Sequence, residues 1–290
     1  MYYDHREPLR LMPSHRVLAM NRGEKEGFLK VALDVDKEKA QQLVRYGFVQ
    51  QTGSPACKYV AQACDDAYTR LIAPSLDTEL RAELTDKASA AAIRVFALNL
   101  RPLLMQPPVR GKVAMGLDPG IRTGCKVAVV DETGRVLDTG VIFPLPSHGK
   151  VAQAKETVKR MIQKHHVGIV AIGNGTAGRE TEQFFVEVMK ELALGDALKY
   201  MVVSEAGASV YSASKLAAEE FPQFDVSLRS AVSIARRLQD PLAELVKIDP
   251  KAIGVGQYQH DLKAAELDAA LGGVVEDCVN LSLIHISEPT

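Results

Sequence analysis

Two acidic residues lie at the ends of predicted strands, where proteins of alternating strands and helices commonly carry catalytic side chains. Asp118 ends the apolar run VAMGLD, and Glu205 ends the apolar run YMVVSE. Carboxylate oxygens are ligands that Mg²⁺ prefers, and two such ions about 3.5–4 Å apart can hydrolyse phosphodiesters. We therefore take Asp118 and Glu205 as candidate catalytic and metal-binding residues facing one cleft. The alternatives are that Asp118 starts a turn before Pro119 and that Glu205 caps the helix after it.

A glycine-rich segment, residues 173–178, reads GNGTAG and satisfies G-x-G-x-x-G between a predicted strand and a predicted helix. Taken alone, this pattern is the fingerprint of dinucleotide binding. It also fits a loop that contacts nucleic acid phosphate with Arg179 nearby, or a tight turn with close packing of helix on strand. The preceding antiparallel meander and the late position of Glu205 argue against a dinucleotide, and the tight turn is favoured.

The elements that must position these residues follow a definite order. Apolar alternation predicts three strands joined by turns, then strands and helices in alternation. The predicted strands are 113–118, 126–132, 135–143, 167–172 and 200–205, and the predicted helices are 149–165, 179–193, 207–219 and 227–239. Three antiparallel strands followed by two strands reached through helical crossovers give a mixed α/β sheet flanked by helices. This order is similar to that of the RNase H-like fold.

In nucleases of that fold a third carboxylate stands at the start of the last helix. Here the segment is LRSAVSIA, with Arg229 and Ser230 at that place. Arg229 would lower metal affinity and could pair with Asp118 or Glu205. Asp225 can substitute if its loop turns inward, whereas Asp240, about 16 Å further along the helix, is too distant to do so easily. We expect an incomplete site that requires no cofactor and binds Mg²⁺ weakly. A metal-dependent nuclease or resolvase is the alternative.

Around this domain the chain divides further. Residues 1–108 are predicted to be helical, with 27–35 as a strand or hairpin edge, and Pro107 and Pro108 stop the last helix. Residues 109–240 form the RNase H-like domain. Residues 241–280 are a linker and a helix over 261–280. Residues 281–290, LSLIHISEPT, are expected to be a non-native tail.

Several long runs carry a family resemblance. They are PSHRVLAMNRGEKEG, GLDPGIRTGCKVAVVDETG, AIGNGTAGRET, SEAGASVYSAS, LRSAVSIARRLQDPLAELVKIDPKAIGVGQYQHD and VVEDCVN. Together they resemble the Tex family of transcription accessory proteins. The resemblance implies a YqgF-type RNase H-like domain that follows a helical region containing a helix-turn-helix. It also implies that residues 241–280 are a linker and the start of a helix-hairpin-helix region, with an S1 domain beyond this chain, and it implies binding of nucleic acid, mainly RNA, in bacterial transcription.

The expected partners are RNA, with DNA as a further candidate, and the transcription machinery. The basic residues that we expect to contact nucleic acid are Arg122, Lys126, Arg179 and Arg229. There is no Trp, and no aromatic platform for stacking bases stands out. Because the S1 domain carries much of the family's RNA affinity, this chain should bind RNA more weakly than a whole family member.

Composition sets the remaining limits. The 290 residues are 47% hydrophobic and 24% charged, with a formal net charge of −1. No window approaches the roughly 18 consecutive apolar residues of a membrane span. The four cysteines form no C-x-x-C pair, so neither a disulfide framework nor a zinc site is indicated. We expect a cytoplasmic protein that does not interact with membranes.

Overall fold

The computed structural model describes residues 4–50, 53–254 and 256–287. The chain divides into two compact units. The first contains Met1–Val95 and Gly256–Leu267, and the second contains Phe96–Val255 and Asp268–Thr290. The first unit is helical, and the second holds the sheet with its candidate carboxylates.

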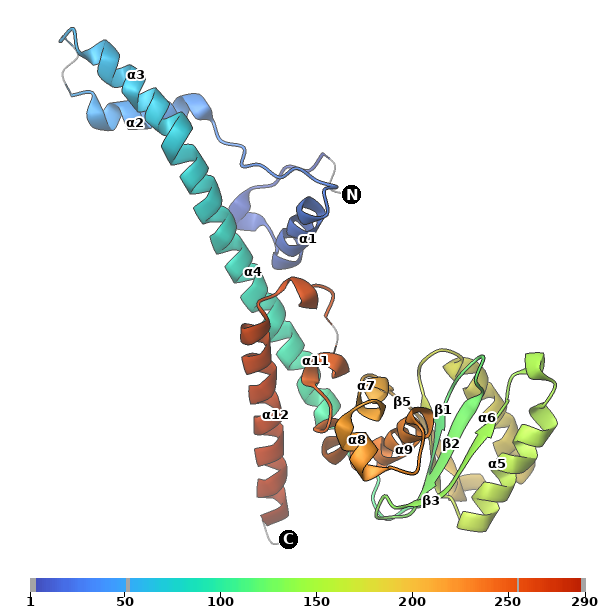
Figure 1. Cartoon of the computed structure of the whole chain (residues 1–290). Coiled ribbons are helices and arrows are strands. Elements are labelled where there is room, and N and C mark those ends of the chain that lie inside the picture. The colour runs from blue at the N-terminus through green and yellow to red at the C-terminus, as the bar shows by residue number, and fades with distance from the viewer. Residues whose placement is uncertain (1–3, 51–52, 255, 288–290) are drawn as a thin grey trace. The chain divides into compact units, whose positions relative to one another are not determined.

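The second unit is built on a five-stranded sheet of order β3-β2-β1-β4-β5 (Figure 1). The strands are β1 (Ala114–Asp118), β2 (Cys125–Val130), β3 (Val136–Ile142), β4 (Ile169–Gly173) and β5 (Lys199–Val203). β1 pairs antiparallel with β2, and β2 pairs antiparallel with β3. On its other side β1 pairs parallel with β4, which pairs parallel with β5. The predicted mixed sheet and RNase H-like order are confirmed, with each strand within a few residues of its expected limits.

Helices cover both faces of this sheet (Figure 1). α5 (Val151–His165) and α6 (Gly178–Leu192) cover one face, and α9 (Val226–Gln239) lies on the other. β1, β2 and β4 are wholly or almost wholly buried because they are covered on both sides. The side chains of the central strands therefore pack into two separate apolar cores, one under α5 and α6 and one under α9.

One predicted helix is broken in two. Residues 207–219 form α7 (Ala208–Ser212) and α8 (Lys215–Glu220). The break occurs because the hydroxyl of Ser214 accepts a hydrogen bond from the backbone N–H of Ala217 at 3.2 Å and starts a new helix. After α9 come two further short helices, α10 (Pro241–Leu245) and α11 (Pro250–Ile253).

The first unit consists of helices that bind one another through side chains. They are α1 (Ser14–Lys25), α2 (Lys37–Phe48), α3 (Cys57–Ala67) and the first part of α4 (Ala73–Leu104), and a π-helical turn, η2 (Tyr68–Ile72), joins α3 to α4. The amide of Asn21 on α1 donates to the hydroxyl of Thr85 on α4 at 2.9 Å. The expected strand over 27–35 is wrong, because this segment has no regular backbone pairing.

The remaining elements are short 3-10 helices and one long helix. The 3-10 helices are η1 (Leu9–Leu11), η3 (Pro146–His148), η4 (Gly195–Ala197) and η5 (Gln259–Asp261). The last helix, α12 (Ala264–Ser287), starts later than the predicted 261–280 and extends further. Among the helices that the structure describes, none is both long and apolar enough to cross a membrane.

Candidate functional site

The two candidate carboxylates meet at one edge of the sheet. Because β1, β4 and β5 run parallel, their carboxyl ends lie at the same edge. Asp118 is the last residue of β1, and Glu205 follows the end of β5. Gly173, the last residue of β4, lies between them. A Cβ there would be 2.9 Å from Glu205 Oε2 and 3.0 Å from Pro119 Cδ. Ligands of open α/β sheets commonly bind at such an edge.

Glu205 lies over the glycine loop. Its backbone N–H donates to Oδ1 of Asn174 at 3.1 Å. A Cβ on Gly175 would be only 1.6 Å from Glu205 Oε1, so the carboxylate fills the space that a larger residue would need. A Cβ on Gly178 would lie 2.8 Å from the carbonyl oxygen of Gly173, because α6 begins directly against β4. These contacts support the tight-turn interpretation, since a pyrophosphate at Gly175 would meet the carboxylate of Glu205.

Asp118 is partly buried and has one neutral side-chain partner. The hydroxyl of Ser230 on α9 lies near its carboxylate and favours the charged form. Burial, and to a smaller extent the nearby charge of Glu205, raises the pKa of Asp118 to about 6, although Ser230, Lys126 and Arg237 act in the opposite direction. Both effects are the usual causes of an elevated carboxyl pKa. Asp118 therefore changes its charge close to neutral pH.

The close approach of α9 to β1 brings Ser230 to this position. A Cβ on Gly116 of β1 would be 2.2 Å from the carbonyl oxygen of Ala231 and 2.8 Å from the backbone nitrogen of Ala235. Only glycine permits this contact between the backbones of helix and strand. The start of α9 therefore lies directly over the end of β1, where a nuclease of this fold would carry its third carboxylate.

Two arginines of α9 have structural partners. Arg229 donates to the carbonyl oxygen of Phe221 at 3.2 Å and to that of Ser212 at 3.4 Å. Its guanidinium is therefore directed to these carbonyls, and no ion pair with Asp118 or Glu205 is found among the described residues. Arg237, which sequence reasoning missed, is 3% exposed and acts electrostatically on both carboxylates. Its place seven residues after Ser230, two helical turns along the same face, is the signal that could have revealed it.

Among the residues that the structure describes, no third acidic ligand joins the pair. Across residues 4–50, 53–254 and 256–287, no group of three or more His, Cys, Asp or Glu side chains could hold a metal ion. Asp225 faces its own helix instead, since its carboxylate accepts from the backbone N–H of Leu228 at 2.8 Å and caps α9. Asp240 in the same way caps α10 through the N–H of Ala243. Both acidic neighbours are therefore used as helix caps.

The other basic candidates differ in their surroundings. Arg122, on the loop between β1 and β2, and Arg179, in the first turn of α6, are both exposed. Lys126 is only 8% exposed, and its ammonium donates to oxygens of Thr123 and Gly124. Arg122 and Arg179 are thus free to meet a phosphate at this edge, whereas Lys126 holds the loop together.

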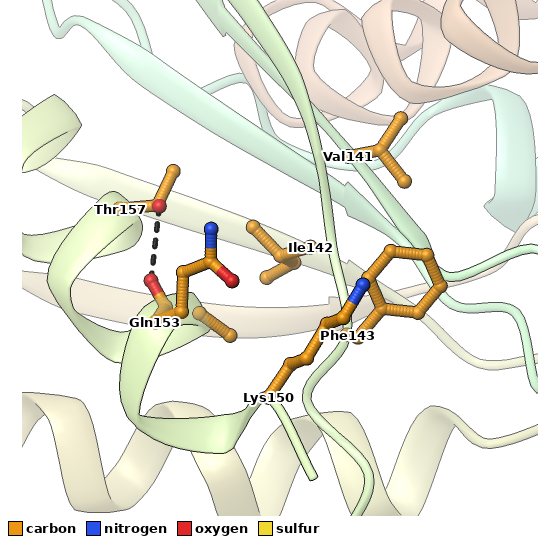
Figure 2. A pocket seen from close by; sticks show the side chains of 7 residues that line it. Val141, Ile142, Phe143, Lys150, Gln153 and Thr157 are labelled. Carbon is orange, nitrogen blue, oxygen red and sulfur yellow. Dashed lines mark hydrogen bonds between the residues drawn. The ribbon is translucent and has the colours of Figure 1, made fainter. Parts of the chain in front are cut away.

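A separate small cavity of about 110 Å³ lies between the end of β3 and the start of α5 (Figure 2). Its lining residues are Val141, Ile142, Phe143, Lys150, Gln153, Ala154 and Thr157. The ammonium of Lys150 lies 5.0 Å from the centre of the Phe143 ring, which satisfies it locally. Neither candidate carboxylate lines this cavity, so it is distinct from the sheet-edge site.

Strand order, crossovers and a carboxylate pair at the ends of β1 and β5 define an RNase H-like domain, joined here to a helical region. Comparison with known proteins agrees. Residues 112–239 match the family described as Tex protein YqgF-like domain, and residues 1–96 match the one described as Tex central region-like. The chain belongs to the Tex family, of which it contains the central region and the YqgF-like domain.

Individual relatives share about half of its residues. The chain is 51% identical over 287 residues to the uncharacterized protein YdcI of Bacillus subtilis, covering 99% of this chain and 40% of that protein. It is 48% identical to the transcriptional accessory protein Tex of Neisseria gonorrhoeae, covering 96% of this chain and 37% of that protein. It is 42% identical to human S1 RNA-binding domain-containing protein 1, covering 96% of this chain and 28% of that protein. The chain thus spans less than half the length of these relatives.

Proposed function

We propose that this chain is the part of a transcription accessory protein whose RNase H-like domain binds nucleic acid, mainly RNA, as a scaffold. The observation that carries this proposal is the partner of Asp118. Ser230, a neutral hydroxyl, faces Asp118 from α9 where a nuclease of this fold would need a carboxylate. Such a site can still bind nucleic acid, whereas two-metal catalysis needs more negative charge to hold two divalent ions against their mutual repulsion.

The donor set fits a single weakly held Mg²⁺ and not the two-ion arrangement. Asp118 and Glu205 supply carboxylate oxygens, which are suitable for Mg²⁺. Ser230 adds one neutral oxygen, and Lys126 and Arg237 place positive charge close to Asp118. We propose that Mg²⁺ is not required for the function of this domain.

Arg122 and Arg179 are the proposed phosphate contacts. Both are exposed and flank the sheet edge, one on the loop after β1 and one after the glycine loop. Arginine forks match phosphate oxygens in pairs of hydrogen bonds. DNA is a second candidate ligand, because phosphate contacts do not by themselves distinguish the two nucleic acids.

For the longer protein we propose a cytoplasmic role together with the transcription machinery. The printed names of two relatives support this proposal, one being a transcriptional accessory protein and the other containing an S1 RNA-binding domain. Because this chain spans only part of their length, its own RNA affinity should be lower than theirs.

A binding titration tests the proposal. Fluorescence anisotropy with labelled single-stranded RNA at several salt concentrations should show binding that weakens as salt rises. The double variant Arg122→Ala/Arg179→Ala should weaken it. The matched control Arg160→Ala/Lys190→Ala removes the same charge from exposed positions of α5 and α6 and should have little effect. Equal losses in the two double variants would contradict a specific contact at the sheet edge.

A cleavage assay tests the scaffold role. The chain is incubated with Mg²⁺ or Mn²⁺ and with single-stranded or branched RNA and DNA, and no cleavage is expected. Cleavage that disappears in Asp118→Asn would overturn the proposal and establish a nuclease. The Asp118→Asn variant separates this outcome from a contaminating nuclease, which it would leave unchanged.

A further inference from the structure

Arg237 lies buried behind the carboxylate pair. It follows Ser230 by two turns of α9, so both side chains leave the same face of that helix. Its Nη1 donates to the carbonyl oxygens of Ser204 and Ala206 at 2.7 and 2.8 Å. These two carbonyls belong to the residues on either side of Glu205. The guanidinium therefore fixes the backbone on both sides of Glu205 through these two carbonyls.

In the part of the chain that the structure describes, Arg237 forms no direct ion pair with a carboxylate. Among the described residues, its Nε and Nη2 atoms have no hydrogen-bond partner although the side chain is 3% exposed. Burial lowers the pKa of Arg237, and Glu244, Glu205 and Asp118 oppose this, with Glu244 acting most strongly. Glu244 already accepts a hydrogen bond from the ammonium of Lys247 at 2.9 Å. That bond uses Oε2 of Glu244, whereas its buried Oε1 has no hydrogen-bond partner among the described residues, so the positive charge of Arg237 is shared between Glu244 and the Asp118–Glu205 pair.

We propose that Arg237 is a built-in counter-cation for Asp118 and Glu205, which takes over the charge-neutralising part of a bound metal ion. This inference rests on the proposed scaffold function and names how its degenerate site is stabilised. Two carboxylates close together repel each other in a partly buried site. A fixed guanidinium offsets that repulsion continuously, and it also repels any divalent cation that approaches.

Two consequences follow for the intact chain. The wild-type site needs no divalent ion for stability, so Mg²⁺ should leave its melting temperature unchanged. Removal of the guanidinium charge should instead make the carboxylate pair a better cation site. At the effective dielectric of a protein site, removing one unit charge near the bound ion changes ion affinity by on the order of tenfold or more.

The experiment compares wild type with Arg237→Gln. Mn²⁺ binding is measured by electron paramagnetic resonance, and thermal unfolding is followed with and without Mg²⁺. We expect Arg237→Gln to melt at a lower temperature, to recover part of the loss in Mg²⁺, and to bind Mn²⁺ on the order of tenfold more tightly than wild type. Unchanged Mn²⁺ affinity, or an equal effect of Mg²⁺ on wild type, would overturn the inference.

Arg236→Gln is the matched control. Arg236 is the adjacent arginine of α9, but it pairs with Glu220 and the carbonyl oxygen of Gly134. Its replacement should not change Mn²⁺ affinity. Adding Glu205→Gln to Arg237→Gln should abolish the gained Mn²⁺ binding, and persistence of that binding would place the ion elsewhere and contradict the inference.

A folding failure of Arg237→Gln is also informative. In that case Arg237→Gln/Glu205→Gln removes the cation together with one carboxylate. Recovery of a folded chain supports a charge-balancing role, whereas failure to recover assigns Arg237 only to the carbonyls of Ser204 and Ala206 and overturns the inference. Metal-dependent cleavage by wild type would defeat the proposed function. Unchanged Mn²⁺ affinity with normal RNA binding would defeat this inference alone.

Discussion

Gly175 has no side chain because the carboxylate of Glu205 occupies its place. A Cβ on Gly175 would lie 1.6 Å from Glu205 Oε1 and 2.2 Å from its carboxyl carbon. The glycine pattern thus serves the candidate site directly, by allowing an acidic side chain to lie across the loop between β4 and α6. This relationship makes the two residues energetically dependent on each other.

Gly175→Ala should therefore destabilise the chain. The added methyl group displaces only the flexible end of Glu205, so we expect a loss of about 1 kcal/mol in the free energy of unfolding, the lower end of the usual range for overpacking. Urea denaturation followed by circular dichroism measures it. Adding Glu205→Ala should recover part of this loss, because the carboxylate no longer competes for the space.

Gly272→Ala is the control for this experiment. Gly272 lies inside α12 with open space where its Cβ would be. Alanine there should stabilise the helix by about 0.5–1 kcal/mol. If Gly175→Ala cost as much stability in the Glu205→Ala background as in wild type, the carboxylate of Glu205 would not occupy the space beside Gly175 in solution.

Gly116→Ala should be more damaging than Gly175→Ala. Its Cβ would meet the backbone of α9 at Ala231 O, 2.2 Å away, and a backbone cannot turn aside as a flexible carboxylate can. We expect a loss of about 3 kcal/mol or more, through displacement of α9 from β1. The same urea denaturation ranks the two variants, and the reverse order would show that α9 is not held tightly against the sheet.

Asp118 should make stability fall as pH rises from about 4 to about 6. Its pKa is raised to about 6 in the folded chain, so the folded state retains a proton that the unfolded state releases near pH 3.9. Its stabilising contribution is complete below the unfolded pKa and is lost as pH rises through the folded pKa. Two pKa units correspond to a change of at most about 3 kcal/mol.

Asp118→Asn isolates this contribution. The difference in unfolding free energy between variant and wild type should grow in favour of the variant between about pH 4 and pH 6. Taking the difference cancels the titration of other carboxyl groups that the two chains share. A difference that stays constant over this range would mean that Asp118 titrates normally in the folded chain.

Arg229→Gln should affect stability without affecting RNA binding. Its guanidinium donates to the carbonyl oxygens of Ser212 and Phe221, which end α7 and follow α8. Loss of these bonds should cost about 1–3 kcal/mol. Denaturation and anisotropy on the same preparation test both parts. Reduced RNA affinity with unchanged stability would instead show that Arg229 contacts phosphate.

Local sequence patterns were sufficient for the sheet and its crossovers. The predicted strands, such as 113–118, show apolar alternation at every second residue, and 227–239 shows helical periodicity. Both patterns are properties of neighbouring residues, so they can be recognised along the chain. The split between α7 and α8 was missed because it depends on one side chain, Ser214, capping a new helix. The segment 27–35 looked like a strand, but it forms no strand pairing.

The residue types Asp118 and Glu205, their places after strands, and the family were all determined by the sequence alone. Tertiary structure decided what surrounds them. Ser230 faces Asp118, Arg229 turns to carbonyls, and Arg237 lies behind the pair. These contacts join segments far apart in the chain, and their strength depends on distances of a few ångströms. The close approach of α9 to β1 sets those distances, and no local pattern contains them.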